Sequence, residues 1–390
     1  MKSDRELGIV VYGATGYTGK LVADYLNQRY GVGGEISWAM AGRSQDKLEA
    51  TRDELGVASD ATMIVADAGD PESLRSMVER ASVVLTTVGP YQLYGSDLVA
   101  MCAQAGTDYV DLCGEPNWMR EMINSQDATA RQSGARIVFS CGFDSIPFDL
   151  GVWFLQDNAI QTHGSPVPRV RGRVRDIKGV WSGGTLASFR ATRAAVAENP
   201  ELATTLMDPF ALTPGFQGAP QPHGMKPMYD DVLESWVAPF MMAIINTKTI
   251  HRSNMLQNHR YGEQFVYDEM LITGPGDQGE AAAKAVAADT SMETDQTQPG
   301  EGPTKQQREE GYYDLLFVGE AADGSLIRAA VTGDMDPGYG STSKMIAEAA
   351  VCLLENPELG SGGVLTPAAA MGGSLVHRLQ NNAGLSFKLE

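Results

Sequence analysis

The chain has 390 residues, of which 43% are hydrophobic, so it is long enough to form two domains with sizeable cores. Its formal net charge of -19 argues against nucleic acid and anionic membrane surfaces as partners, because their phosphate groups would be repelled. No apolar run approaches the ~18 residues of a membrane-spanning helix, and the N-terminus lacks a signal-peptide core, so we expect a cytoplasmic protein without a transmembrane segment.

The cysteines and histidines do not follow metal-binding patterns. The four cysteines form no CxxC pair, and the five histidines include no HxxxH or HExxH spacing. We therefore expect no metal site. The cysteines lie in apolar surroundings and are predicted to be buried free thiols, as is usual in a reducing compartment.

The first 142 residues alternate between short apolar runs and helical patterns. Strands are predicted at residues 8–12, 36–41, 62–67, 82–89, 108–113 and 135–142. Helices are predicted at 17–28, 44–55, 71–81, 96–105 and 118–132, with Ser44 and Ser96 as N-caps. Apolar strands that alternate with helices are typical of a doubly wound parallel sheet. We therefore predict an α/β fold with a Rossmann domain over residues 1–145.

The pattern changes after this domain. A helix is predicted at 146–157, strands at 170–177 and 263–274, and a hairpin at 312–321 and 325–334 around an Asp-Gly turn. These elements predict an inserted, mostly antiparallel α+β domain over residues 146–338, which would bind substrate or mediate dimerisation. Residues 339–390 return to helical patterning and are expected to pack back on the Rossmann domain.

Three segments do not fit this alternation. Residues 208–231 are rich in Pro and Gly and are candidates to cover a site, whereas residues 289–310 are polar and predicted to form a mobile surface loop. Residues 236–245 (WVAPFMMAII) are the most apolar stretch and are too short to span a bilayer. They are expected either to line a pocket for an apolar substrate or to be buried in the core or a dimer interface.

A glycine motif, GATGYTG, follows the first predicted strand and opens the first helix. In this context Gly13 permits a tight turn, Gly16 lets the backbone approach a pyrophosphate, and Gly19 lets the helix pack on the strand. The free N–H groups of the first helical turn would then face the phosphates. The predicted cofactor-binding residues of this motif are Gly13, Thr15, Gly16, Tyr17, Thr18 and Gly19.

The end of the second strand indicates which dinucleotide binds. An NAD site usually places a carboxylate there, but this chain has Arg43 and Ser44. Arg43 can pair with a 2′-phosphate and Ser44 can donate to it, although both residues would also suit the start of a helix. We therefore predict NADP(H) as the cofactor. Asp67, at the end of the third strand, is either an adenine-facing carboxylate or a turn-forming residue.

The later strand ends should rim the same crevice, because ligands of such sheets bind at the carboxyl ends of the strands. The predicted cofactor neighbours there are Val88, Gly89, Pro90, Cys113 and Gly114. The candidate catalytic groups are Tyr91, Glu115, Asp144 and Ser145. Each of the four also has a structural explanation as a packed turn, a helix-start carboxylate or a helix cap. Residues 181–185 (WSGGT) are either another close-approach turn or a capped helix start.

Together these segments resemble the saccharopine dehydrogenase-like oxidoreductases, and within them they are most similar to the bacterial trans-acting enoyl reductases. GFDSIP at 142–147 and GGVLTP at 362–367 are the most specific of the matching segments. The resemblance implies a Rossmann domain completed by the C-terminal segment, an inserted α/β domain and a nicotinamide cofactor. It also implies reduction of an enoyl thioester carried by a polyketide synthase. Cys113 and Phe148 depart from the residues expected in this family, a threonine and a small polar residue.

We therefore expect NADPH-dependent reduction of an activated C=C bond in a small-molecule or carrier-bound acyl substrate. One alternative is C=N reduction or secondary amine oxidation, as in saccharopine metabolism, but no cluster of basic residues is placed to hold a dicarboxylate. The other alternative is an NADP(H)-sensing regulator without turnover. A homodimer is compatible with the sequence.

Overall fold

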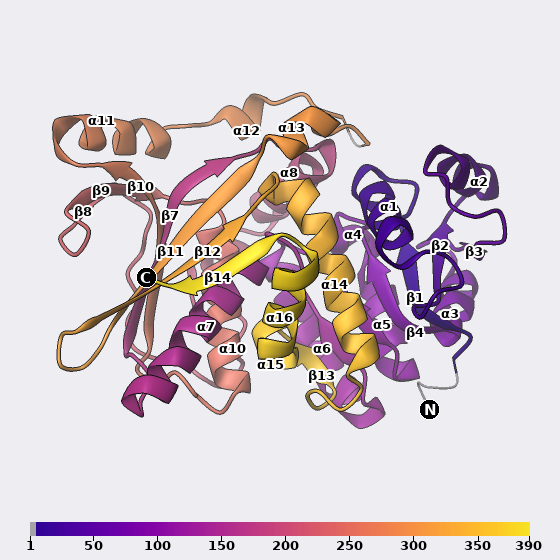
Figure 1. Cartoon of the computed structure of the whole chain (residues 1–390), viewed down its shortest axis with the longest axis horizontal. Coiled ribbons are helices and arrows are strands. Elements are labelled where there is room, and N and C mark those ends of the chain that lie inside the picture. The colour runs from indigo at the N-terminus through magenta and orange to yellow at the C-terminus, as the bar shows by residue number, and fades with distance from the viewer. Residues whose placement is uncertain (1–4, 299) are drawn as a thin grey trace.

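The computed structural model describes residues 5–298 and 300–390, which form two seven-stranded sheets and the helices around them. Figure 1 shows the two sheets side by side along the long axis of the molecule, with helices from the C-terminal part of the chain between them. Helices of the second half meet the carboxyl ends of the strands of the first sheet, and a cavity lies at this junction.

The first sheet is parallel throughout, and its strand order is β13-β6-β5-β4-β1-β2-β3. Its strands are β1 (Leu7–Tyr12), β2 (Trp38–Gly42), β3 (Met63–Val65), β4 (Ala81–Thr86), β5 (Asp108–Val110), β6 (Arg136–Val138) and β13 (Gly363–Leu365). The first six are those that the alternating pattern predicted. The strand order reverses between β1 and β4, which places the ligand crevice at the carboxyl ends of these two strands.

Helices connect these strands as in the predicted Rossmann domain. They are α1 (Tyr17–Tyr30), α2 (Gln45–Glu54), α3 (Pro71–Arg80), α4 (Tyr91–Tyr94), α5 (Ser96–Ala105) and α6 (Pro116–Ser133). Ser44 caps α2 as predicted, because its hydroxyl accepts from the backbone N–H of Lys47. The prediction for Ser96 is wrong: Gly95 is the N-cap of α5, and the Ser96 hydroxyl instead accepts from the Trp118 indole at 2.9 Å.

The second sheet has the order β14-β12-β11-β7-β10-β9-β8. Its strands are β7 (Arg169–Lys178), β8 (Met228–Asp230), β9 (Ser235–Pro239), β10 (Val266–Gly274), β11 (Tyr312–Glu320), β12 (Leu326–Gly333) and β14 (Leu385–Leu389). Only β7 and β10 pair in parallel, so the mostly antiparallel character is confirmed. The predicted hairpin is β11 and β12, which are joined by a turn in which Gly324 has φ +84.

The remaining helices lie around the second sheet and between the two sheets (Figure 1). They are α7 (Ile146–His163), α8 (Gly183–Glu198), α9 (Leu202–Met207), α10 (Ala243–Leu256), α11 (Gly276–Ala287), α12 (Ser291–Thr294), α13 (Lys305–Glu309), the π-helical turn η2 (Pro337–Ser341), α14 (Thr342–Glu355), α15 (Pro367–Ala370) and α16 (Gly372–Asn382). Of these, α7 packs on β11 and β12, and α10 packs on β10.

The polar stretch at 289–310 differs from the irregular loop that its composition predicted. Its described residues include the short helices α12 and α13, and it packs against the start of α1. The Tyr17 hydroxyl donates to the Pro303 carbonyl, and Arg308 donates to the Tyr17 hydroxyl at 2.9 Å. This segment therefore covers the helix that begins at the glycine motif.

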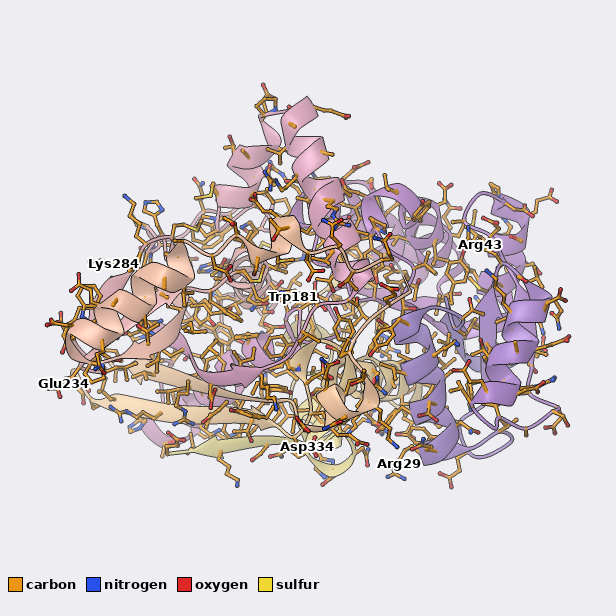
Figure 2. All side chains as sticks on the ribbon, turned by 90° about the horizontal axis from the view of Figure 1, so that it is seen from above. Arg29, Arg43, Trp181, Glu234, Lys284 and Asp334 are labelled. Carbon is orange, nitrogen blue, oxygen red and sulfur yellow. The ribbon has the colours of Figure 1, made fainter. Side chains whose placement is uncertain are left out.

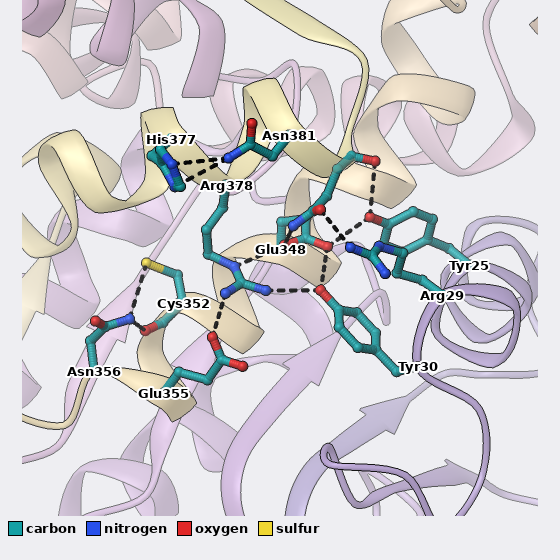
Figure 3. A network of polar contacts seen from close by, with 11 residues as sticks. Tyr25, Arg29, Tyr30, Glu348, Cys352, Glu355, Asn356, His377, Arg378 and Asn381 are labelled. Carbon is teal, nitrogen blue, oxygen red and sulfur yellow. Dashed lines mark hydrogen bonds and ion pairs between the residues drawn. The ribbon is translucent and has the colours of Figure 1, made fainter.

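The C-terminal residues supply one strand to each sheet, β13 and β14, in addition to the predicted helices. A network of polar contacts, shown in Figure 3, joins these helices to α1. Glu348 on α14 is completely buried and accepts from the hydroxyls of Tyr25 at 2.7 Å and Tyr30 at 2.6 Å, and from Arg378 at 2.9 Å. The helix that follows the glycine motif is thus held by side chains from the end of the chain.

All four cysteines are buried and free, as predicted. Within residues 5–298 and 300–390, no helix is long and apolar enough to cross a membrane. In the same part of the chain, no three His, Cys, Asp or Glu side chains are grouped so as to hold a metal ion.

Candidate active site

The glycine motif forms a tight corner between β1 and α1. Gly13 has φ +94, a conformation that residues with a side chain rarely adopt. A Cβ on Gly19 would lie 2.0 Å from the carbonyl oxygen of Gly13, so only glycine allows α1 to approach the strand this closely. Gly16 is exposed on the open side of the corner. This arrangement has the features that a bound pyrophosphate requires.

The start of α1 offers unsatisfied donors to such a phosphate. Its N-cap is Gly16, and no side chain caps the helix. The first N–H groups, at Tyr17 and Thr18, therefore retain their capacity to bind an anion, and the helix dipole favours negative charge there. Thr15 and Thr18 are partly buried on either side of Gly16. These residues fit a dinucleotide phosphate.

The end of β2 fits the 2′-phosphate that distinguishes NADP. Arg43 is exposed at the outer end of the first sheet (Figure 2), and no described residue forms an ion pair with it. The Ser44 hydroxyl accepts a hydrogen bond in capping α2 and keeps its own proton for donation. Asp67 accepts from the backbone N–H of Gly69 at 2.9 Å, so it forms the turn after β3.

A cavity of about 690 Å³ lies beside the glycine corner, between the nucleotide domain and helices of the second half. Trp181, which precedes α8, lines it and lies near the centre of the molecule (Figure 2). The residues from the nucleotide domain include Thr18, Thr87, Gly89, Tyr91, Gly114 and Asp144. The opposite wall is apolar and includes Phe189, Val196, Leu206, Met241, Met242, Ile244, Ile245 and Met292. Four of these come from the apolar stretch 236–245, for which a pocket lining was one of two alternatives. The other alternative, burial in the core, holds for Val237 and Ala238 in β9.

A hydrogen bond joins two of the candidate catalytic residues, Tyr91 and Glu115. Both carboxylate oxygens of Glu115 accept backbone N–H groups at 2.9 Å, one from Tyr91 and one from Gln92. Glu115 thus holds the start of α4, and it does not line the cavity. Tyr91 lines the cavity, but its hydroxyl accepts from the backbone N–H of Leu112 at 3.1 Å, and burial raises its pKa well above the usual value.

Asp144 is the carboxylic acid that lines the cavity. Its carboxylate lies close to Gly114 and Gly142, whose small size leaves it room. No other residue of the described chain donates a hydrogen bond to this side chain, and burial raises its pKa to about 7. A carboxyl group that exchanges its proton near neutral pH is suited to general acid catalysis.

Ser145, the neighbouring candidate, is placed differently. It is completely buried, does not line the cavity and does not cap α7 with its side chain. Its hydroxyl lies 3.0 Å from Asn246 Oδ1 and 3.2 Å from Thr249 Oγ1, which joins α7 to α10. Its surroundings therefore support a packing role. Ser145 is the N-cap residue of α7, as one of its predicted roles has it, but its side chain forms no capping hydrogen bond.

The predicted cofactor neighbours at the later strand ends are only partly brought together. Gly89 and Gly114 line the cavity, whereas Val88 and Pro90 flank Gly89 on either side. Cys113 is completely buried below the cavity floor and accepts from the backbone N–H of Glu115. Phe148 is buried as well and is not part of the lining. The two departures from the family pattern, at Cys113 and Phe148, therefore lie outside the lining of this cavity.

Tyr339 is a site residue that sequence reasoning missed. Its hydroxyl accepts from the backbone N–H of Ser182 at 2.6 Å and lies 2.6 Å from Thr185 Oγ1, at the start of α8. Its ring meets that of Tyr17 edge to face, with centroids 5.4 Å apart. The side chain lines the cavity, as Asp144 does. The motif GYGST around it gave no sign of this contact, because residues so far apart in the chain meet only in the fold.

Comparisons with known proteins agree with this geometry. Residues 9–138 match the family model of the saccharopine dehydrogenase NADP binding domain, so the chain is an NADP-dependent oxidoreductase. A Mycobacterium ulcerans protein named trans-acting enoyl reductase is 36% identical over 407 residues, which cover 97% of this chain and 96% of that protein. A Mycobacterium tuberculosis protein, named as a candidate trans-acting enoyl reductase, is 38% identical over 413 residues, covering 98% and 97%. The chain belongs to this family of trans-acting enoyl reductases.

Solved structures show the same fold in distant proteins. The saccharopine dehydrogenase (L-Glu forming) of Saccharomyces cerevisiae matches with a TM-score of 0.55 at 11% identity, covering 98% of this chain and all of that one (100%). A homospermidine synthase from Legionella pneumophila, in complex with NAD, matches with a TM-score of 0.54 at 9% identity, covering 99% and 92%. These likenesses confirm the α/β architecture.

Proposed function

We propose that the protein uses NADPH to reduce the C=C bond of an α,β-unsaturated acyl thioester with an apolar chain. The observation that carries this proposal is the cavity beside the glycine corner, which combines an apolar wall with one carboxyl group, Asp144, that titrates near neutral pH. The names of the mycobacterial relatives also support an enoyl substrate.

The glycine corner and Arg43 would hold the cofactor. The backbone of Gly13, Gly16 and the start of α1 would receive the pyrophosphate, and Arg43 with Ser44 would receive the 2′-phosphate. Bound NADPH supplies a hydride, which an activated C=C bond accepts at its β-carbon. The same reaction leaves the α-carbon in need of a proton and the thioester oxygen with negative charge.

Two side chains of the cavity can supply the proton and stabilise the charge on the thioester oxygen. Asp144 supplies the proton, because its carboxyl is protonated in a substantial share of molecules at neutral pH and no other described residue binds it. Tyr339 donates to the thioester oxygen: its own oxygen accepts from the Ser182 N–H and, in this arrangement, from the Thr185 hydroxyl, which leaves the phenol proton for the substrate. The apolar wall excludes water from the reacting carbons and thereby strengthens both interactions.

A substrate with two carboxylates, as in saccharopine metabolism, fits this cavity less well. Among the described residues that line it, Arg193 is the one basic side chain, and it pairs with Glu293 at 2.7 Å. Recognition of carboxylates usually requires unpaired or bidentate arginines. The lining therefore favours C=C over C=N reduction.

The proposal is tested by following NADPH oxidation with short and long trans-2-enoyl thioesters, and in parallel with imine substrates. We expect turnover with the enoyl thioesters and a saturated thioester as the product, identified by mass spectrometry. Turnover with imines alone would contradict the proposal. Tight NADPH binding without hydride transfer to either class would instead favour the regulator without turnover.

A further inference from the structure

A second cavity of about 440 Å³ adjoins the first and has no part in the chemistry proposed above. Leu206 on α9 and Ile244 on α10 line both cavities. Within the first two turns of α10, Ile245 lines the first cavity, whereas Thr247 and Lys248 line the second. The two spaces are therefore separated by aliphatic side chains, which can change rotamer without movement of the backbone.

Lys248 gives the second cavity an unusual donor. Its side chain is only 2% exposed, and its ammonium donates to the carbonyl oxygens of Leu206 and Ile244, each at 2.7 Å. An ammonium has three N–H donors, and no described residue accepts the third or forms an ion pair with the group. A buried donor without an acceptor is costly, so an oxygen atom from a ligand would stabilise it.

Three carboxyl groups, those of Asp208, Asp268 and Glu269, line the same cavity, and none of them forms a hydrogen bond or an ion pair with Lys248. Asp208 accepts from the backbone N–H of Phe210 at 2.9 Å. Glu269, which also lines the second cavity, accepts from Asn246 at 2.7 Å and from Tyr267 at 2.8 Å, and burial raises its pKa to about 8. Glu269 is mostly neutral at pH 7, and Asp268 pairs with Arg169 and Arg173. Asp208 acts on Lys248 through its charge without a direct hydrogen bond or ion pair, so the third N–H of Lys248 stays available to an oxygen atom of a ligand.

Exposed methionines surround both cavities. Met207 and Met225 line the second cavity and are 53% and 46% exposed, and Met241 lines the first and is 40% exposed. Single exposed apolar residues are common, but three flexible methionines around adjoining cavities form an adaptable apolar surface. Such a surface suits an alkyl chain that passes from one cavity to the other.

We propose that the second cavity is an acyl-chain subsite: it binds the part of a long acyl substrate remote from the thioester, and Lys248 donates a hydrogen bond to an oxygen substituent on that part. This inference rests on the proposed function for the identity of the ligand. It adds that the protein selects long, oxygen-bearing chains over short or purely hydrocarbon ones.

Binding of saturated probes tests the subsite without turnover. The probes are a butyryl thioester, a long-chain acyl thioester and the same long chain with a hydroxyl at its far end, each titrated calorimetrically into the NADP⁺-loaded protein. We expect the long chain to bind at least about tenfold more tightly than butyryl, and the hydroxylated chain to bind severalfold more tightly again, since about 1.4 kcal/mol corresponds to a factor of ten.

Two variants separate the apolar and polar contributions. Thr247→Phe fills the second cavity and should lower the affinity for both long probes to that of the butyryl probe. Lys248→Met should bind the two long probes equally, because the donor to the hydroxyl is lost. It should still bind both of them more tightly than the butyryl probe. The matched control is Lys284→Met, an exposed lysine on α11 (Figure 2), which should bind all probes as the original protein does.

Equal affinity of the original protein for all three probes would overturn the subsite. The same conclusion would follow if neither Thr247→Phe nor Lys248→Met changed a preference that the original protein shows. Because the probes are saturated, failure of the proposed function is separately visible: long-chain selectivity without reduction of any enoyl thioester would leave the subsite intact and refute the reaction.

Discussion

The carboxylate of Glu115 accepts a hydrogen bond from the backbone N–H of Tyr91 at 2.9 Å. Glu115, which follows β5, thereby fixes the loop that follows the neighbouring strand β4. Its second oxygen receives the N–H of Gln92 at the same distance. Glu115 thereby positions Gly89 and Tyr91, which line the cavity. It acts as a positioning residue, and its buried charge is balanced by N–H donors at the start of α4.

Glu115→Gln should therefore reduce stability and activity without changing the pH dependence of the reaction. An amide offers one acceptor oxygen in place of two, so one hydrogen bond to a charged group is lost, which costs about 1.5–3 kcal/mol. Urea unfolding measures the first effect and kcat against pH the second. The exposed Glu121→Gln on the neighbouring helix α6 is the control. A shifted pH profile in Glu115→Gln would show that this carboxylate takes part in proton transfer.

Arg43→Ala should weaken NADPH binding and leave NADH binding nearly unchanged. The guanidinium has no ion-pair partner in the described part of the chain, and its contact with a 2′-phosphate would contribute about 1.5–3 kcal/mol, or roughly tenfold to a hundredfold in affinity. Fluorescence titration with both nucleotides measures the ratio. An equal loss for NADH and NADPH would mean that Arg43 does not contact the 2′-phosphate.

Asp144→Asn should lower kcat and flatten its pH profile. The pKa of Asp144 is raised to about 7 by burial, and the proposed reaction needs the protonated form, so the rate of the original enzyme should fall as the pH rises above about 7. Asp149→Asn removes another buried carboxyl with a pKa of about 7 that does not line the cavity, and it should keep the original profile. If Asp144→Asn retained the fall above pH 7, another group would be the proton donor.

Asp149 should also make the protein less stable as the pH rises. It is completely buried and accepts from Ser253 at 2.5 Å and from the backbone N–H of Ala368 at 2.8 Å, yet burial raises its pKa from the model-compound range near 4 to about 7. The folded state therefore binds the proton more tightly than the unfolded state. Its contribution is fully present below pH ~4 and is lost as the pH rises to about 7, at up to about 1.4 kcal/mol per pH unit.

Asp149→Asn tests this linkage, because an amide can accept from Ala368 and donate to the Ser253 hydroxyl without titrating. The free energy of unfolding in urea, measured from pH 5 to pH 8, should fall less steeply in the variant than in the original protein. Parallel curves for the two proteins would contradict the assigned pKa.

Glu348→Ala should destabilise the protein strongly. The buried carboxylate holds two tyrosine hydroxyls and Arg378, and removing one partner of a buried ion pair costs about 3–5 kcal/mol. Glu355 also pairs with Arg378, but its side chain is 43% exposed, so Glu355→Ala should cost no more than about 1 kcal/mol. Urea unfolding of the two variants gives the comparison, and similar losses would show that the network in Figure 3 does not anchor α1.

The first six strands of the nucleotide-binding sheet were predictable because each has a local sequence signal. Every residue of β1, which contains the run GIVVY, is buried. Glycine, proline and capping residues mark the starts of the helices that follow such strands. By contrast, β13 is three residues long, which is too short for a periodic pattern. The run LSFKL of β14 does alternate, but it lies at the end of a stretch whose overall pattern was read as helical. Their partners, β6 and β12, are chosen by tertiary packing.

The site was predictable in its cofactor half and less so in its substrate half. The motif at Gly13–Gly19 has a fixed context, whereas the role of Glu115 depends on α4, a helix of four residues that shows no periodicity. Ser145 lies next to Asp144 in sequence, yet the turn before α7 directs one side chain into the cavity and the other toward α10. Tyr339 reaches the site through η2, a π-helical turn that composition does not reveal.

Because β13 and β14 close the edges of different sheets, neither half of the molecule can be isolated by a single cut in the chain. A fragment that stops after residue 145 would expose the backbone of β6, and open strand edges of this kind promote self-association. During synthesis, each sheet stays incomplete until β13 or β14, the strand that comes last in chain order within it, has been made. Expression of separate halves for biophysical work will thus require that β13 be grafted back beside β6.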